Sequence, residues 1–248
     1  MDQPEIFALL AGDATESLKV ERNGAIYHYD LYQGSDEWYA ARCGMLTASE
    51  MSLILTPTLK IASNEKTRAH AWELLAQRIT GYVEPHYLGD EMVRGQVEEV
   101  AARKAYNDHF APVREVGFVT SSRWGFTLGY SPDGLVGDDG LIEIKSRRQR
   151  FQIETILANA PPPEFMLQMQ TGLLVTGRKW CDFISYSGGL PMIVCRVLPD
   201  ERLQSAIIEA ATAFEADLAQ KLAAYRARIA ADQKLIPTER VIEQEMYA

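Results

Sequence analysis

The sequence predicts a single α/β domain, and three features indicate this class. Segments rich in β-branched and aromatic residues alternate along the 248 residues with segments whose apolar residues have helical spacing. An Asp-Gly pair at 139–140 separates two short apolar stretches and predicts a hairpin. Residues 201–231 carry an apolar stripe and predict one long C-terminal helix. No repeat, low-complexity tract or long linker divides the sequence, so we assign residues 1–248 to one domain.

The composition is that of an ordinary globular protein, with 47% hydrophobic and 24% charged residues. A net charge of −9 is unusual for a nucleic-acid-binding protein, but residues 145–150, KSRRQR, concentrate positive charge locally. No apolar run reaches membrane-spanning length, and residues 1–5 lack the basic start of a signal peptide. We therefore expect a cytoplasmic protein with no membrane partner. The three cysteines and four histidines do not have the spacing of a disulfide scaffold or a zinc site.

The first half of the chain is expected to alternate short strands and helices. Ser35 is a favourable N-cap for a helix that Gly44 ends, and Ser49 offers a second N-cap. The polar stretch 56–66 predicts a loop. The expected elements are a strand at 25–32, helices at 35–44, 49–55, 67–80 and 91–110, and strands at 113–120 and 126–130. Apolar residues at helical spacing predict the helix at 91–110, namely Val93, Val97, Val100 and Ala101.

The second half is expected to complete the sheet and add three helices. The apolar helix at 165–175 contains Gln168 and Gln170, and polar residues inside such a helix need partners. The expected elements are a strand at 141–145, helices at 151–160 and 165–175, a hairpin of 180–187 with 191–198, and the helix at 201–231.

The hairpin around residue 139 carries the strongest chemical signal. In the strand after the turn, Glu143 and Lys145 share one face, and the turn can bring Asp133 beside them. Two adjacent carboxylates favour a divalent cation, and carboxylate oxygens are the ligands that Mg²⁺ prefers. A water on such an ion becomes acidic enough to attack phosphorus. The alternative is an exposed hairpin with an ordinary Glu and Lys, but the apolar neighbours predict a buried strand, in which charges need partners.

A second signal lies between the two helices near residue 44. Arg42 at the end of one helix and Ser49 at the start of the next are expected to lie close together. A guanidinium and a hydroxyl beside a helix start suit a phosphate. The alternative is a brace in which Arg42 only bonds carbonyl groups, and the residues by themselves leave both possibilities open.

Several motifs occur together in order, and their combination resembles a known family. The motifs are QGSDEW at 33–38 with RCG at 42–44 and TAS at 47–49, Gly95 with Glu99 and Arg103, SPDG at 131–134, EIK at 143–145 and QMQ at 168–170. The Asp, Glu-x-Lys pattern is similar to the PD-(D/E)xK nuclease motif. The whole set, over roughly residues 31–180, resembles the phage lambda exonuclease family of alkaline, YqaJ-type viral recombination exonucleases. The resemblance implies a restriction-endonuclease-like core, with a central mixed β-sheet flanked by helices.

The resemblance also implies roles for individual residues. Asp133, Glu143 and the Ile144 carbonyl would bind Mg²⁺, for which Mn²⁺ would substitute, and Glu99 would contribute a further acid. Lys145 would position or deprotonate the attacking water, and Gln168 would line the site. The residues that match a pocket for the terminal 5′-phosphate are Arg42, Ser49 and Ser131. Beyond the resemblance, the basic run adds candidate DNA contacts at Arg147, Arg148 and Arg150. One departure is that residues 121–125, SSRWG, lack the acid that some family members carry before Ser-Pro-Asp.

The activity implied is processive 5′→3′ digestion of double-stranded DNA ends. It would release 5′-mononucleotides and leave 3′ single strands for an annealing protein. The family further implies a ring-shaped homotrimer that threads DNA, encoded by a phage or prophage in a bacterial host. One alternative is a structure-specific or restriction-type endonuclease, which has no use for a terminal-phosphate pocket. Another is a catalytically silent DNA-binding protein, which needs no metal triad.

Overall fold

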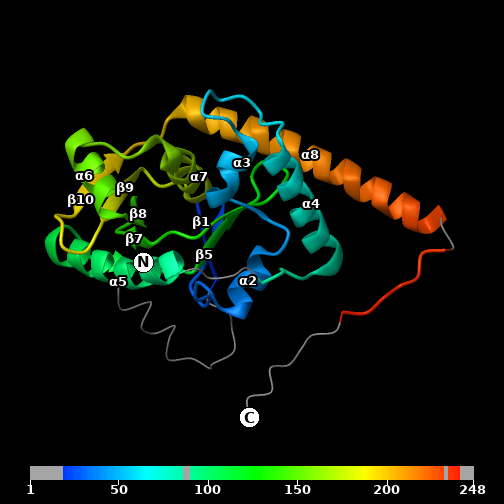
Figure 1. Ribbon diagram of the computed structural model, residues 1–248, viewed down its shortest axis with the longest axis horizontal. Helices are drawn as coiled ribbons and strands as arrows, with labels where there is room; N and C mark the ends of the chain where they lie inside the picture. The colour runs from blue at the N-terminus through cyan, green and yellow to red at the C-terminus, as the bar shows by residue number, and fades with distance from the viewer. Residues whose placement is uncertain (1–18, 86–89, 232–233, 241–248) are drawn as a thin grey trace, which may run out of the picture.

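The computed structural model describes residues 19–85, 90–231 and 234–240, and it confirms the predicted α/β class (Figure 1). The described strands form two five-stranded mixed sheets rather than the one central sheet that was expected. Helices pack on the faces of these sheets. The helices and 3₁₀ turns are α2 (Asp36–Arg42), η1 (Ala48–Glu50), α3 (Met51–Ile54), α4 (Glu65–Thr80), α5 (Asp90–His109), α6 (Gln149–Ala158), η2 (Pro163–Phe165), α7 (Met166–Thr176) and α8 (Glu201–Ala231).

The first sheet holds the strands that precede the Ser-Pro-Asp motif. Its order is β1 (Lys19–Arg22), β2 (Ala25–His28), β5 (Phe118–Ser121), β6 (Leu128–Tyr130) and β3 (Leu46–Thr47). Neighbouring strands are antiparallel except β3, which pairs parallel with β6. This pairing places residue 47, at the end of β3, beside the strand that runs directly into Ser131 and Asp133.

The second sheet holds the Glu-x-Lys strand at its centre. Its order is β10 (Ile193–Val197), β9 (Trp180–Tyr186), β8 (Gly140–Ser146), β7 (Gly134–Val136) and β4 (Val113–Arg114). The predicted hairpin is confirmed, because β7 and β8 pair antiparallel across residues 137–139. Gly137 has a φ of 50°, a conformation that favours glycine. The hairpin returns the chain so that Asp133, just before β7, lies next to the middle of β8.

Strand β8 is buried on both faces, as its sequence predicted. Leu141 belongs to a hydrophobic cluster with Met169 and Leu173 of α7. Ile142 and Ile144 belong to a second cluster, with residues of α5. Helices α5 and α7 therefore cover opposite faces of this sheet (Figure 1). The charged side chains of β8 are confined between packed layers, where each of them needs a partner.

Helix α5 forms where predicted, but the face assigned to its core contact is wrong. Val97 and Val100 are 68% and 64% exposed, and the side chain of Val93 lies outside the described residues. The buried residues are instead Ala102 and Tyr106. Polar contacts fix this rotation. The Tyr106 hydroxyl donates to Asp182 of β9 at 2.7 Å. Glu98 accepts a hydrogen bond from Ser146 of β8, and Glu99 lines the cavity described below.

Helix α8 is buried over only part of its predicted stripe. Ile207, Phe214 and Leu218 are buried, and α8 packs against α7 and α4. Tyr225 and Ile229 are exposed, where the helix projects beyond the body of the molecule (Figure 1). None of the helices in the described part of the chain is long and apolar enough to cross a membrane.

Candidate active site

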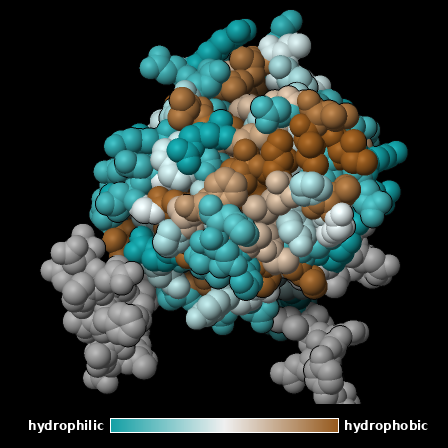
Figure 2. Space-filling model, turned by 90° about the vertical axis from the view of Figure 1, so that its left-hand side faces the viewer, coloured by the Kyte–Doolittle hydropathy of each residue, from teal (hydrophilic) through white to brown (hydrophobic). Residues whose placement is uncertain are grey.

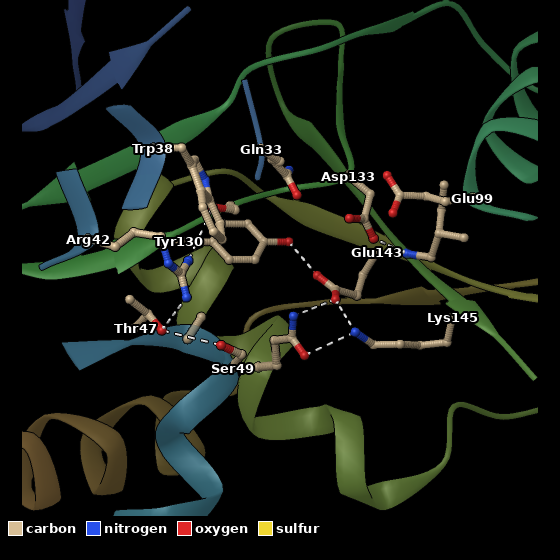
Figure 3. A pocket seen from close by; sticks show the side chains of 14 residues that line it. Gln33, Trp38, Arg42, Thr47, Ser49, Glu99, Tyr130, Asp133, Glu143 and Lys145 are labelled. Atoms are coloured by element: carbon tan, nitrogen blue, oxygen red, sulfur yellow. Dashed lines mark hydrogen bonds and ion pairs between the residues drawn. The ribbon is translucent and has the colours of Figure 1, made fainter. Parts of the chain in front are cut away.

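A cavity of about 220 Å³ brings together residues that are far apart in the sequence (Figure 3). Every residue predicted for metal binding, catalysis or phosphate binding lines it. These residues are Arg42, Ser49, Glu99, Ser131, Asp133, Glu143, Ile144, Lys145 and Gln168. The lining residues come from helices and from strands of both sheets, so only the folded chain brings them together.

Glu143 is the most deeply buried acid of the cavity, with only 1% of its side chain exposed. Its Oε2 accepts a hydrogen bond from the Tyr130 hydroxyl at 2.8 Å. Its Oε1 accepts from Gln168 Nε2 at 2.5 Å and lies 2.7 Å from Lys145 Nζ. Three donors thus hold the carboxylate in one orientation and offset the cost of burying its charge.

Asp133 and Glu99 face the same space as Glu143 (Figure 3). Burial and the neighbouring charges of Glu143 and Glu99 raise the pKa of Asp133 well above its usual range. Burial also raises the pKa of Glu99, although the Arg103 guanidinium opposes this rise. The backbone N–H of Ile144 donates to Asp133 Oδ2 at 2.5 Å and fixes that side chain. The crowded carboxylates therefore favour a cation.

The donor set fits Mg²⁺ better than a metal held by protein ligands alone. No group of three or more His, Cys, Asp or Glu side chains is gathered closely enough to hold a metal among the described residues. Mg²⁺ usually takes one or two carboxylates and keeps several waters. Asp133 and Glu143, which lie beside Ile144 in a polar cavity, meet this requirement.

Lys145 lies beside Glu143 as a cation. Burial alone would lower the pKa of Lys145, but the carboxylates of Glu143 and Asp133 outweigh this effect and raise it. Gln168 Oε1 accepts a hydrogen bond from the ammonium at 3.2 Å. Gln168 thus bonds both Glu143 and Lys145, which accounts for a polar residue in an apolar helix.

Arg42 contacts hydroxyl groups at the other end of the cavity. Its guanidinium donates to Ser131 Oγ at 3.4 Å and to Thr47 Oγ1 at 3.2 Å. It also stacks over the Trp38 ring, 4.2 Å from the centroid. These contacts place a cation and several hydroxyls around one space, with Ser49 at its edge. Of the two possibilities for Arg42, this arrangement favours an anion pocket over a carbonyl brace.

The N-cap predicted at Ser49 is wrong. Thr47 is the N-cap of η1, and Glu50 completes a capping box by accepting from the Thr47 backbone N–H at 2.8 Å. The pattern Thr-x-x-Glu at 47–50 carries this signal in the sequence, and it competes with Ser49. As a result, the Ser49 side chain does not cap the helix and lines the cavity instead.

Five residues that line the cavity were assigned no role from the sequence, namely Gln33, Trp38, Thr47, Ala48 and Tyr130. Trp38 Nε1 donates to Ser131 Oγ at 3.0 Å, so the Ser131 hydroxyl is an acceptor there and its own proton can point elsewhere. Thr47 was signalled by its capping box. Tyr130 directly precedes the Ser-Pro-Asp motif, but its contact with Glu143 depends on how two sheets meet and leaves no local pattern.

The three arginines of the basic run lie apart from the cavity, since none of them is among the described residues that line it, although Lys145 at the start of the run does line it. Arg147 is only 11% exposed and packs against the rings of Phe151 and Phe165, at 5.0 and 5.2 Å. Arg148 and Arg150 are exposed at the start of α6. The three remain predicted DNA contacts, but the packing of Arg147 leaves it less available than its neighbours.

The segment at 121–125 has a structural role in place of the missing acid. Arg123 Nη2 donates to the carbonyl oxygen of Val175 at 3.2 Å and also bonds that of Leu174. These bonds tie the turn after β5 to the end of α7.

Comparisons with known proteins identify the family to which this chain is similar. A family model described as a YqaJ-like viral recombinase domain matches residues 37–179. The structure is similar to an alkaline exonuclease, LHK-Exo, from Laribacter hongkongensis, with a TM-score of 0.71 and 36% identity over 79% of this chain and 98% of that one. The complex of LHK-Exo with dAMP matches with the same TM-score and coverage, at 37% identity. No match was found among curated protein sequences.

Proposed function

This chain belongs to the YqaJ-like viral recombinase family, and from this we propose that it is a Mg²⁺-dependent exonuclease that digests double-stranded DNA from its 5′ ends. The family and the similarity to an alkaline exonuclease support exonuclease activity. The dAMP bound by LHK-Exo supports deoxynucleoside 5′-monophosphates as the products. The proposed 5′→3′ direction rests on a pocket for the terminal 5′-phosphate at Arg42 and Ser131.

One observation carries the proposal: Arg42 with its hydroxyl partners and a cluster of acids line the same cavity, so that an anion pocket would lie beside a metal site. The cluster contains Asp133 and Glu143, and the pocket contains Arg42 and Ser131. A 5′-phosphate in the pocket would set the next phosphodiester beside the acids. An endonuclease has no need for a terminal-phosphate pocket, so this pairing favours an exonuclease.

Asp133, Glu143 and the Ile144 carbonyl would hold the divalent ion, with Glu99 as a further contributor. When bound, a divalent ion supplies Lewis-acid polarisation of the scissile phosphate and activation of water. Glu99 would have to leave Arg103, its present partner, to contribute a ligand. Arg103 also donates to the Asp133 carbonyl at 2.9 Å, so it links the two acids in the resting site.

The other residues of the cavity provide charge and orientation. The Lys145 ammonium is placed to stabilise negative charge that develops on the phosphorus oxygens. The Glu143 and Asp133 carboxylates raise the pKa of Lys145, which favours the ammonium form that this role requires. Gln168 and Tyr130 hold Glu143 from two sides, so its ligand oxygens are fixed before DNA arrives.

An exposed apolar surface supports self-association of the chain. Figure 2 shows hydrophobic residues gathered at the end of the molecule where α6 and β10 lie in Figure 1. Ile153 and Leu157 of α6 and Leu198 after β10 are exposed apolar side chains. Such a surface supports a subunit contact, and we propose the ring-shaped homotrimer of the resembled family. A ring around DNA would give processivity and would deliver the 3′ strand to a single-strand annealing protein.

Arg42→Ala is expected to erase a preference for phosphorylated 5′ ends. A charge-assisted hydrogen bond is worth roughly 1.5–3 kcal/mol, so the loss of Arg42 should slow digestion of phosphorylated ends about 10- to 100-fold. Digestion of 5′-hydroxyl ends should change little, because the missing partner is the phosphate. Initial rates on matched 5′-phosphate and 5′-hydroxyl duplexes measure this effect.

Two further variants make the comparison specific. Arg42→Lys keeps the charge but loses the two-pronged geometry, so it should restore only part of the preference. Arg22→Ala removes an arginine that pairs with Asp138 at the surface and should leave both rates unchanged. Equal wild-type rates on the two ends would remove the pocket from the proposal.

A further inference from the structure

A second groove opens beside the active-site cavity. It encloses about 530 Å³, and the side chains of Gln33, Trp38, Glu99 and Asp133 form a wall that both spaces share. The groove carries more aromatic side chains than the cavity, in which the aromatic lining residues are Trp38 and Tyr130. Its aromatic lining includes Tyr29, Tyr32, Trp38 and Tyr39.

Two aromatic side chains of this groove, Tyr32 and Tyr39, are exposed and lie outside the hydrophobic core. Tyr32 is 77% exposed and Tyr39 is 41% exposed. The ring of Tyr39 lies edge-on to Trp38, with centroids 5.0 Å apart, so the Trp38 side chain links the groove to the phosphate pocket. The floor carries polar groups, because Arg103 pairs with Glu115 at 3.0 Å.

The backbone under the groove is closely fitted. A Cβ added to Gly117 would lie 1.9 Å from the carbonyl oxygen of Leu31, so only glycine allows the two segments to meet. This contact packs Leu31, which precedes Tyr32, against Gly117, which directly precedes β5. The groove is therefore a built feature of the fold and not a gap between loose loops.

The position of the groove matches what the terminal nucleotide requires. With its 5′-phosphate at Arg42 and its 3′-phosphodiester at Asp133, the nucleotide spans the wall that both spaces share. Its base then has to leave a small cavity lined by charged groups. The groove offers aromatic faces next to that wall and has the volume of a typical small-molecule site. Stacking on aromatic faces accepts every base, as a sequence-independent exonuclease needs.

We propose that this groove is the subsite for the base of the 5′-terminal nucleotide, with Tyr32 and Tyr39 as its stacking residues. The inference rests on the proposed exonuclease function and adds a second point of recognition to it. The phosphate pocket identifies the end, and the groove holds the base that will leave with the product.

The test compares duplexes whose phosphorylated 5′-terminal residue is either deoxyadenosine or an abasic analogue. We expect the wild type to release the abasic residue at least about tenfold more slowly in a single turnover, since stacking on aromatic side chains is the interaction lost. The double variant Tyr32→Ala/Tyr39→Ala should bring the two rates close together. The matching Phe variant should keep the difference, because it retains both rings.

Tyr225→Ala provides the matched control. Tyr225 is 43% exposed, nearly the same as Tyr39, but it lies on the projecting part of α8. This variant should behave as the wild type. The preference for phosphorylated ends should also survive in the double Ala variant, which separates a failure of the groove from a failure of the phosphate pocket.

A binding measurement keeps the inference testable without activity. The wild type should bind dAMP at least about tenfold more tightly than deoxyribose 5-phosphate, and the double Ala variant should bind the two equally. Equal binding by the wild type would overturn the inference. So would a double Ala variant that binds single-stranded 3′ overhangs weakly but still discriminates against the abasic end, since the groove would then serve the other strand.

Discussion

Glu143→Gln is expected to reduce cleavage about 1,000-fold or more while the protein stays folded. The substitution keeps the size of a side chain that is almost fully buried, and it removes the charge that a divalent ion needs. Asp133→Asn should have a comparable effect for the same reason. Cleavage of a linear duplex at saturating Mg²⁺ and the affinity for Mg²⁺ are the two measurements.

The control for these variants lies on the same hairpin. Asp138→Asn changes an exposed acid in the loop between β7 and β8, which pairs with Arg22 outside the cavity, and should keep full activity. Thermal unfolding should be followed in parallel, because Glu143 is the partner of a buried Lys145. A folded Glu143→Gln protein that retains most of its activity would remove Glu143 from the metal site.

Lys145→Met is expected to lower turnover at least about 100-fold with little loss of metal or DNA binding. The ammonium is held by Glu143 and Gln168, and in the proposed mechanism it faces the phosphate on which negative charge develops. A group that acts on developing charge affects the transition state more than the bound substrate. Single-turnover rates, together with separately measured affinities for DNA and Mg²⁺, distinguish these effects.

Lys179→Met serves as the comparison, since Lys179 is an exposed lysine that pairs with Asp139 outside the cavity. It should leave turnover unchanged. If Lys145→Met weakened DNA binding and left turnover intact, the residue would belong to the basic run that follows it and not to the chemistry.

The central strand and the composition of the site could be predicted because local patterns determine them. The alternation in β8 fixed the faces of Leu141 and Ile142, and the turn before it fixed the return of Asp133. The family motifs supplied the residues that had to meet. Their meeting in one cavity, from both sheets, is a tertiary fact that the structure adds.

Other features depend on competition between distant contacts, and local patterns did not reveal them. The rotation of α5 follows from Tyr106 bonding Asp182, which overrides an apolar stripe through Val97 and Val100. Arg147 was predicted to contact DNA, but two phenylalanine rings pack against it. Tyr106 and Asp182 are distant in the sequence, as are Arg147 and Phe165, so no short window contains both partners of either pair.

The most direct test of the account is digestion of one DNA sequence in two forms, as a 5′-phosphorylated linear duplex and as a covalently closed circle, with Mg²⁺ and with a chelator. We expect that the linear form is converted to 5′-mononucleotides and a 3′-ended single strand, that the closed circle stays intact, and that the chelator stops the reaction. Cleavage of the closed circle at a rate comparable to that of the linear duplex, or digestion that continues in the chelator, would contradict it.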